Sequence, residues 1–428
     1  MKKLTLILVT GLLCGIVFSI NAQNSIRIDA SFYSEVLDEV KNIDIYLPAD
    51  YYVHPEQYYA TIYRLHGAEG NQNSGNTDAQ WYYDLHAQDT TISSPPAIFV
   101  CPDGSCEPYG GSCWMNSGLY GPYEDYFMQD VIGFVESNFR AYPVKNFRLL
   151  TGSSMGGYGS ARFAVNYPDM FRACVPSIGF LSIPDTTLNA WKDLYYAENG
   201  SYVPAVNNGT NTQLLLTVCG GFSPNTANPP CYVDFPFDTL GNWVDTVLNR
   251  WYENDLSRKV KDLPDEHGLS WFMICGTQDY MVPHPTYQVF TDSLDFYGIG
   301  YDHSYFEGGH VFDGESWATA IHWMDSIIEL SFQIDGIPIH RETIGNVKVN
   351  PNPAVDQVHI SYQVKEAGTA VISIFNNAGQ LMETLSREHL RAEEYRFVWS
   401  IAGYRPGIYY CRVQMGYGFE TKKIVKVN

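Results

Sequence analysis

Short runs of apolar residues, each followed by a glycine-rich or polar loop, recur along the first three quarters of the chain. Such runs cover Thr61–Leu65, Phe147–Thr151 and Leu269–Gly276, and a shorter strand-like run covers Asp302–Glu307. Helix-like segments such as Ala318–Leu330 alternate with them. Continuous apolar runs are typical of strands buried on both faces, as in a parallel sheet covered by helices. This part of the chain is therefore predicted to form an α/β domain with a mostly parallel central sheet.

A different pattern follows after Ser331–Asn346, which reads as a linker. Apolar and polar residues alternate there in short segments separated by turns such as Asn377–Gln380. This spacing predicts a small all-β sandwich over residues 346–428. The predicted strands are Gln357–Val364, Thr369–Asn376, Tyr395–Ser400, Gly407–Val413 and Glu420–Val427.

The chain begins with a basic Met1–Lys3, continues with an apolar Leu4–Ile20 and then offers a small-residue cleavage site around Ala22. These three features predict a secretory signal peptide over residues 1–22. No other segment is long and apolar enough to span a bilayer. The expected organisation is a signal peptide (1–22), the α/β domain (23–332), a linker (333–345) and the β-sandwich (346–428).

A G-x-S-x-G pattern, Gly152–Gly156, stands between the strand-like Phe147–Thr151 and a helix-like run. In this context the pattern forms a tight strand-to-helix turn that exposes the serine hydroxyl above the sheet. The two glycines are expected where strand and helix nearly touch. The turn also places the hydroxyl at a helix N-terminus, which favours developing negative charge. Ser154 is therefore the predicted nucleophile.

A nucleophilic serine needs a base and an acid that orients the base, and in one large class of hydrolases these follow along the chain as acid and then histidine. Asp279 lies just past the predicted strand Leu269–Gly276, and His310 follows the strand-like Asp302–Glu307 in a glycine-rich loop. Both are expected at the carboxyl edge of the sheet, where open α/β sheets bind ligands. His284 is the competing base, and Asp302 is the fallback acid, although Asp302 precedes its strand.

Backbone N–H groups are also needed to stabilise the oxyanion of an acyl-transfer reaction. The N–H of Met155, directly after the serine, is one expected donor, and the N–H of Ala68 in the loop after Thr61–Leu65 is the other. His66 opens this loop. We expect it to order the loop by hydrogen bonding rather than to act in catalysis or bind a metal.

With these motifs in place, the chain resembles the esterase D and feruloyl esterase-like branch of the α/β-hydrolases over roughly residues 40 to 330. The resemblance rests on several motifs in order along the chain: Tyr63–Gly67, Val100–Gly104, Tyr123–Tyr126, Gly152–Gly157, Cys275–Asp279 and Gly308–His310. It implies an α/β-hydrolase fold and a serine esterase with Ser154, Asp279 and His310 as the triad. It also implies Ala68 and Met155 as oxyanion donors and calls for no cofactor. Mycolyltransferases in the same branch leave acyl transfer open as an alternative.

The C-terminal segment resembles the sorting domain of type IX secretion. The resemblance rests on Asn350–Ala354, Asn377–Gln380, Arg405–Tyr409 and the basic ending Lys422–Lys426. It implies the type IX secretion machinery as a partner and a secreted or cell-surface location. A carbohydrate-binding or adhesive sandwich is the alternative interpretation of this segment.

The formal net charge of −21 argues against binding to nucleic acid or to an anionic membrane. Export permits disulfides, and two local pairs are predicted: Cys106 with Cys113, and Cys219 with Cys231. Cys101, Cys174 and Cys275 lie in apolar runs and are expected to be buried thiols. No spacing of His, Cys or Asp indicates a metal site.

Aromatic residues and a long insert indicate the kind of substrate. Trp114, Tyr120 and Tyr123 cluster after Asp103 and are candidates for substrate contacts, because aromatic walls stack on sugar rings and aryl acids. The insert from Ser182 to Leu240 is expected to cover Ser154 as a lid or wall. The predicted substrate is an acylated carbohydrate or a small ester, with acetyl or feruloyl groups on plant-type polysaccharide. A non-catalytic carbohydrate-binding protein on a hydrolase scaffold is the remaining alternative.

Overall fold

The computed structural model describes the backbone of residues 4–6, 16–19, 24–89, 91–92, 94–200, 209–264, 267–281, 284–335, 344–365, 368–376, 381–415 and 418–427. The predicted signal peptide and the predicted linker fall mostly outside these residues, as does the predicted turn at 377–380. The chain divides into two compact units, and the boundary lies between Ser331 and Phe332.

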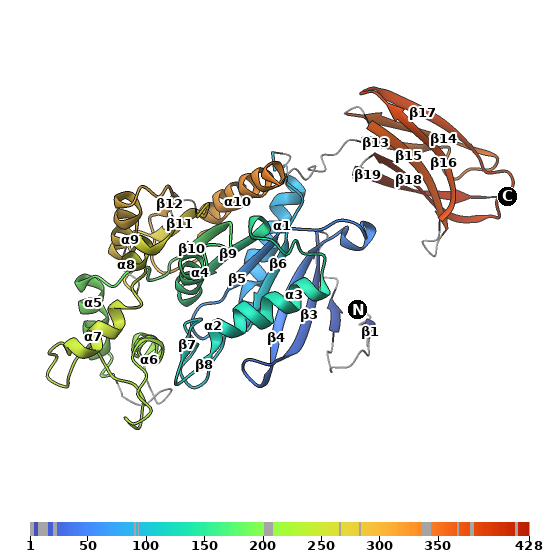
Figure 1. Cartoon of the computed structure of the whole chain (residues 1–428). Helices are drawn as coiled ribbons and strands as arrows, with labels where there is room; N and C mark the ends of the chain where they lie inside the picture. The colour runs from blue at the N-terminus through green and yellow to red at the C-terminus, as the bar shows by residue number, and fades with distance from the viewer. Residues whose placement is uncertain are drawn as a thin grey trace. The chain divides into compact units, whose positions relative to one another are not determined.

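A large sheet forms the centre of the first unit (Figure 1). Over the described residues its strand order is β1-β2-β3-β4-β6-β5-β9-β10-β11-β12. Strands β6, β5, β9, β10, β11 and β12 run parallel to one another, whereas β1 to β4 form an antiparallel edge that joins β6 through β4. The sheet is therefore mostly parallel, as predicted. The strands are β1 (Leu4–Leu6), β2 (Ile16–Ser19), β3 (Ser25–Ser34), β4 (Glu39–Pro48), β5 (Thr61–Leu65), β6 (Ile98–Pro102), β9 (Arg148–Ser153), β10 (Ala173–Ser177), β11 (Ser270–Gly276) and β12 (Asp302–Phe306). A separate hairpin joins β7 (Asn116–Ser117) and β8 (Gly121–Pro122).

Helices cover both faces of this sheet (Figure 1). Helices α3 and α4 pack on one face, and α1 and α10 pack on the other. The helices are α1 (Asn76–Gln88), α2 (Tyr123–Asp125), α3 (Ile132–Asn138), α4 (Met155–Asn166), α5 (Asp185–Ala197), α6 (Thr210–Phe222), α7 (Asp245–Tyr252), α8 (Leu256–Lys259), α9 (Pro285–Phe296) and α10 (Gly314–Ile334). Short 3₁₀ turns cover Tyr51–Val53, Gln72–Gly75, Lys145–Phe147 and Val260–Asp262, and a π-helical turn covers Tyr126–Val131.

Strand β5 shows why the apolar runs form the inner strands. All five of its residues are buried, because helices cover the sheet on both sides. On one face, the Tyr63 ring lies edge-on to Phe127, which in turn stacks on Phe163 of α4 with ring centroids 4.4 Å apart. On the other face, the Arg64 guanidinium donates to the Asp78 carboxylate of α1 at 2.6 Å. That buried charge is therefore paired, as a buried charge must be.

The strands that carry the predicted site lie close to their expected positions. Strand β5 has the expected bounds, and β9, β11 and β12 differ by one or two residues at their ends. Helix α10 extends the predicted Ala318–Leu330 segment by one turn at each end. The carboxyl ends of these strands consequently meet at one edge of the sheet.

The second unit contains two antiparallel sheets, with strand orders β13-β14-β17 and β16-β15-β18-β19 over the described residues. Their inner faces share one apolar core that includes Trp399. The strands are β13 (Ile344–Asn350), β14 (Gln357–Val364), β15 (Gly368–Asn376), β16 (Leu381–Leu390), β17 (Glu394–Ser400), β18 (Gly407–Met415) and β19 (Gly418–Lys426). The sequence reading missed β16, which contains several charged residues and pairs with β15 through two register shifts that break the alternation.

Candidate active site

Ser154 lies at the sharp turn between β9 and α4. Its backbone has φ 57° and ψ −120°, a conformation that L-residues rarely adopt. The Ser154 N–H donates to the Ser177 carbonyl oxygen at 2.9 Å, which holds the turn against β10. A Cβ at Gly152 would lie 2.3 Å from the Gly156 carbonyl oxygen, so the turn needs glycine there, as expected for a strand and helix in backbone contact.

Three side chains from the ends of three strands form a continuous hydrogen-bonded line. His310 Nε2 lies 2.9 Å from Ser154 Oγ, and His310 Nδ1 lies 2.7 Å from Asp279 Oδ2. The Asp279 side chain is fully buried, and its second oxygen accepts the Met281 N–H at 2.9 Å. A buried carboxylate at Nδ1 favours the tautomer that leaves Nε2 free to accept the serine proton.

The competing residues lie elsewhere. His284 caps α9, and its ring packs edge-on against Tyr305 at 5.0 Å. Asp302 stands at the start of β12, the opposite end of the strand from His310, and accepts the Trp323 indole N–H at 2.8 Å. The structure thus brings Asp279 and His310, and neither competitor, to Ser154.

The expected oxyanion donors flank the serine. Met155 is the first residue of α4, so its N–H has no acceptor within the helix. Gly67 lies so close to the turn that an added Cβ would be 3.3 Å from Ser154 Cβ, and Ala68 borders the same cavity as Ser154. The backbone of the loop after β5 therefore lies next to Ser154, and within the described residues no backbone hydrogen bond uses the Ala68 N–H.

His66 orders this loop, as predicted. Its Nδ1–H donates to the Gly67 carbonyl oxygen at 2.8 Å, and its Nε2 accepts the Gly104 N–H at 2.8 Å. Burial lowers the pKa of His66 to about 4, so the ring is neutral near pH 7. A neutral ring can accept at one nitrogen and donate at the other, which is what these two bonds require.

A cavity of about 260 Å³ opens beside Ser154 and is mostly apolar. Helix α6, from the insert at 182–240, supplies one wall, so the insert does border the serine as expected. Glu69 is the one carboxylate among the described lining residues. The lining consists of Gly67, Ala68, Glu69, Ser154, Ile178, Thr210, Gln213, Leu214, Thr217, Met281 and His310.

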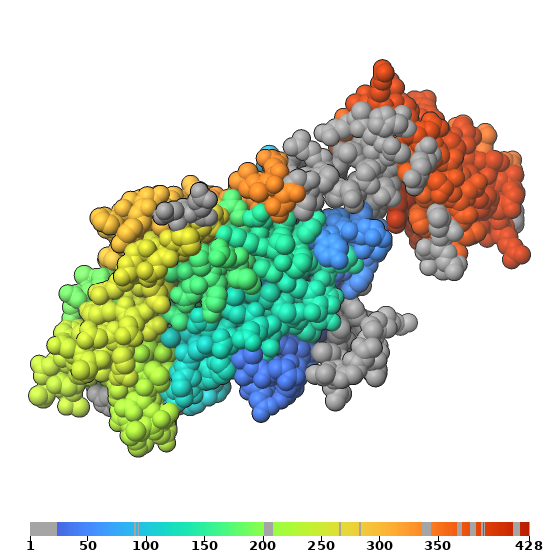
Figure 2. All heavy atoms as spheres, viewed as in Figure 1, coloured from blue at the N-terminus to red at the C-terminus, as the bar shows by residue number. Residues whose placement is uncertain are grey.

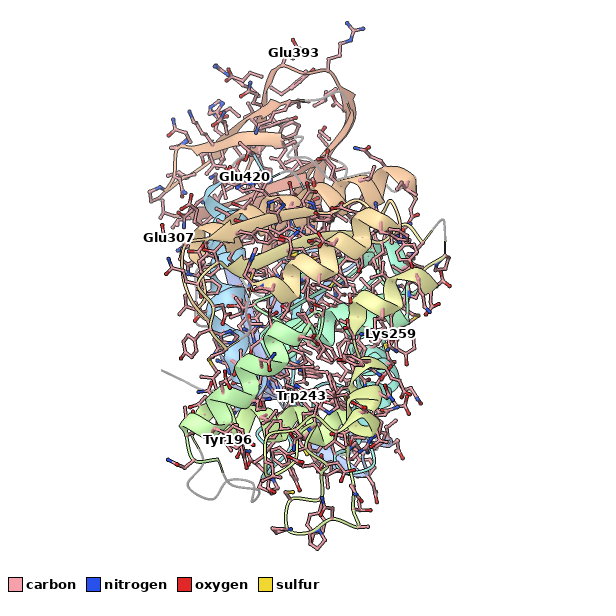
Figure 3. All side chains as sticks on the ribbon, turned by 90° about the vertical axis from the view of Figure 1, so that its left-hand side faces the viewer. Tyr196, Trp243, Lys259, Glu307, Glu393 and Glu420 are labelled. Atoms are coloured by element: carbon pink, nitrogen blue, oxygen red, sulfur yellow. The ribbon has the colours of Figure 1, made fainter. Side chains whose placement is uncertain are left out.

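The insert continues beyond this wall as the yellow-green end of the first unit in Figure 2. Aromatic rings pack against one another there: Phe237 contacts Tyr196 and also Trp243, which follows the insert, at 5.7 and 6.1 Å between ring centroids, and Figure 3 labels Tyr196 and Trp243. Phe237 therefore serves packing in this part of the unit.

The three aromatic candidates for substrate contact are a correction. Trp114, Tyr120 and Tyr123 are all buried and do not border the cavity. The Trp114 indole donates to the His66 carbonyl oxygen at 3.1 Å, and the Tyr120 and Tyr123 hydroxyls donate to the carbonyl oxygens of Thr217 and Ser105. The polar atoms of these side chains are hydrogen-bonded to the backbone, and because the rings are buried they offer no face to a ligand.

The sequence reading named none of the α6 residues that form the cavity wall. Thr210, Gln213, Leu214 and Thr217 follow i, i+3, i+4, i+7 spacing, which marks one face of a helix. That periodicity predicts that these four residues share a helix face, but it does not predict that this face meets Ser154.

The predicted disulfides are absent from the structure. Cys106, Cys113, Cys219 and Cys231 are all free cysteines. The Cys113 thiol faces the Thr217 carbonyl oxygen at 3.5 Å, and the Cys231 thiol faces that of Val233 at 3.7 Å. Proximity along the chain was not a sufficient guide, because a bridge also needs the two Cβ atoms aimed at one another. Cys101, Cys174 and Cys275 are buried thiols, as predicted.

Within the described residues, no group of three or more His, Cys, Asp or Glu side chains could hold a metal ion. In the same part of the chain, no helix combines the length and the apolar character needed to cross a membrane.

Comparison with known proteins agrees with this arrangement. Residues 34–324 match the Putative esterase family, and residues 348–427 match the Secretion system C-terminal sorting domain. Esterase Rv1288 of Mycobacterium tuberculosis H37Rv and Esterase MT1326 of strain CDC 1551 are each 29% identical to this chain over 146 residues, 33% of its length. The chain spans 29% of the length of these curated relatives.

Among solved structures, a ferulic acid esterase superposes with a TM-score of 0.50 at 18% sequence identity. The match covers 72% of this chain and 99% of that one, and it shows a shared α/β-hydrolase fold. The family match covers more than half of the chain, over the residues that carry Ser154, Asp279 and His310. The chain therefore belongs to the Putative esterase family and carries a type IX secretion sorting domain at its C-terminal end.

Proposed function

We propose that this protein is a secreted serine esterase that hydrolyses carboxylic esters through an acyl-enzyme intermediate. The observation that supports this most strongly is the hydrogen-bonded line from Ser154 through His310 to the buried Asp279, beside a cavity. A serine hydroxyl becomes an effective nucleophile when an adjacent, oriented imidazole can take its proton.

In the proposed reaction, Ser154 Oγ attacks the ester carbonyl carbon while His310 Nε2 takes the hydroxyl proton. Asp279 holds the Nδ1–H and stabilises the imidazolium that forms. The Ala68 and Met155 N–H groups stabilise the tetrahedral oxyanion. His310 then gives its proton to the alcohol oxygen as the C–O bond breaks. A water molecule then attacks the acyl carbon while His310 takes its proton. The bond to Ser154 Oγ breaks, His310 returns the proton to Ser154, and the carboxylic acid leaves.

The proposed substrates carry acetyl or feruloyl groups on plant-type polysaccharide or its fragments. The sorting domain supports a secreted or cell-surface location, reached through the type IX machinery after export by a signal peptide. At such a location an esterase meets polymers that do not enter the cell. The mostly apolar cavity of about 260 Å³ supports an uncharged acyl group such as acetyl or feruloyl.

The test is hydrolysis of an ester panel by the wild type and by Ser154→Ala. The panel contains p-nitrophenyl acetate, p-nitrophenyl butyrate, methyl ferulate and acetylated xylan. We expect activity on at least one acetyl or feruloyl ester, with loss of at least 1,000-fold in Ser154→Ala. Rates that the substitution leaves unchanged would refute the proposal. Product analysis with added alcohols separates hydrolysis from acyl transfer.

A further inference from the structure

Two exposed aromatic side chains lie in contact next to the loop that carries His310. Trp81 of α1 is 45% exposed, Phe312 is 43% exposed, and their ring centroids are 6.2 Å apart in an edge-to-face arrangement. Trp81 also covers Gly314 at the start of α10, where an added Cβ would lie 2.7 Å from the indole. The pair is thus held in place on the protein while a large part of each ring meets solvent.

Two further exposed apolar side chains directly follow triad residues in the chain. Val311, directly after His310, is 55% exposed, and Tyr280, directly after Asp279, is 62% exposed. The two loops that carry these residues are joined, since the Gln278 N–H donates to the Gly308 carbonyl oxygen at 2.8 Å. We refer to the exposed side chains of Trp81, Phe312, Val311 and Tyr280 as the apolar strip, in which Val311 and Tyr280 directly follow the triad residues His310 and Asp279 in the chain.

The chemistry of the proposed reaction decides which part of an ester reaches this strip. The alcohol oxygen must come within hydrogen-bond distance of His310 Nε2 to take its proton. The α6 wall of the cavity, with Leu214 and Thr217, is then available for the acyl group. An alcohol portion larger than a few atoms must extend from His310, and the exposed apolar side chains that follow His310 in the chain are Val311 and Phe312.

We propose that Trp81 and Phe312, with Val311 and Tyr280, form a subsite for the alcohol portion of the ester, and that this portion is a neutral sugar ring. The inference rests on the proposed esterase function and adds the residues that bind the sugar of its substrate. Ring faces of Trp and Phe stack on the C–H face of a pyranose, and polar groups around them accept hydrogen bonds from its hydroxyls.

The surroundings of the strip favour a sugar over a lipid chain. Glu315 follows Gly314 and is exposed, and Glu307, labelled in Figure 3, is exposed directly after β12. These carboxylates can accept hydrogen bonds from hydroxyl groups. An alkyl chain would instead have to desolvate them without any compensating bond, which is costly.

The test compares three acetates that share one acyl group and differ in the alcohol: ethyl acetate, dodecyl acetate and acetylated xylotriose. We expect Trp81→Ala and Phe312→Ala each to raise KM for acetylated xylotriose about 3- to 10-fold relative to KM for ethyl acetate. Trp81→Phe should restore part of the difference. Phe296→Ala is the matched control, because Phe296 and Tyr297 form an exposed edge-to-face pair at the far end of α9.

A binding measurement separates failure of the subsite from failure of the esterase. In the Ser154→Ala background, calorimetry should show that Trp81→Ala weakens binding of acetylated xylotriose by the same factor, whether or not the wild type turns it over. Unchanged binding and an unchanged KM ratio overturn the subsite. A larger effect on dodecyl acetate than on the sugar ester overturns the choice of a sugar.

Discussion

Gly156 of α4 lies against Leu65 of β5 with no room for a side chain: an added Cβ would be 2.0 Å from the Leu65 carbonyl oxygen. Helix and strand therefore meet backbone to backbone directly below the reacting groups. This contact places Ser154 and the Met155 N–H beside the His66–Ala68 loop that follows β5. Because Gly156 has no side chain, the nucleophile turn and the loop after β5, which are far apart in sequence, can lie side by side.

We predict that Gly156→Ala abolishes esterase activity and destabilises the fold by about 2–4 kcal/mol, because backbone atoms cannot move aside as a flexible side chain would. Gly133→Ala in α3 is the matched control. No atom lies within 4 Å of its added Cβ, and alanine should stabilise the helix by about 0.5–1 kcal/mol. Urea denaturation of both variants measures the two effects. Equal stability of the two proteins would contradict the close contact.

Asp279→Asn should lower kcat by about 10³- to 10⁴-fold, because an amide at this position no longer favours the tautomer with the proton on His310 Nδ1. KM for a small ester should change little, since Asp279 does not border the cavity. Steady-state kinetics on p-nitrophenyl acetate measures both constants. The matched control is Asp302→Asn, which removes a carboxylate from the other end of β12 and should keep the wild-type kcat. A comparable loss in Asp302→Asn would make Asp302 the acid.

Glu69→Gln should relax discrimination against anionic substrates. The Glu69 carboxylate borders the cavity, so it repels an ester whose acyl group carries a negative charge. Removing it should raise kcat/KM for a monomethyl succinate ester about 3- to 10-fold relative to methyl butyrate at low salt. Because Glu69 is exposed, the change should shrink as salt is added. Glu56→Gln removes an exposed carboxylate away from the cavity and should leave the ratio of the two rates unaltered.

The buried His66 should make stability depend on pH. Burial holds its folded-state pKa at about 4, below the value near 6.5 expected in the unfolded chain. Between these values the unfolded state binds more protons, so the free energy of unfolding falls as the pH drops from 6.5 to 4. The contribution of His66 to this fall is at most about 3 kcal/mol.

Burial lowers the pKa of His86 to about 4 as well, so the wild type alone does not separate the two histidines. A substitution of His66 isolates its contribution. His66→Asn should be less stable than the wild type at pH 7, since it loses the acceptor for the Gly104 N–H. The difference in free energy of unfolding between the two proteins should narrow as the pH falls to 4. Chemical denaturation at several pH values measures this difference, and a constant difference would show that His66 does not titrate in the window.

The local pattern was enough to predict the strands and the order of the site residues. Runs such as Thr61–Leu65 are apolar because both of their faces are covered, and this property can be read in the sequence without knowing the neighbours. Ser154 and Asp279 follow such runs, and His310 follows the shorter, more polar strand β12. Parallel strands end at the same edge of a sheet, so the expectation that these residues meet needed only the strand assignments.

The residues that line the cavity could not be predicted from the local pattern. Trp114, Tyr120 and Tyr123 looked like ligand contacts because they are aromatic and cluster in a loop, but folding buries them and satisfies their polar atoms on the backbone. A side chain of this kind packs equally well against protein or ligand. Only the path of the chain decides between the two.

By itself, the sequence determined the α/β architecture, the sorting domain and the residues that form the hydrogen-bonded line, because each depends on residue types at short spacing. Only the tertiary structure decided which helix forms the wall of the cavity, which aromatic residues stay exposed and that the four cysteines of the two predicted bridges stay free. The physical reason is that these features depend on contacts between segments far apart in the chain. Trp81 and Phe312 meet across more than 200 residues, and neither position signals the other in the sequence.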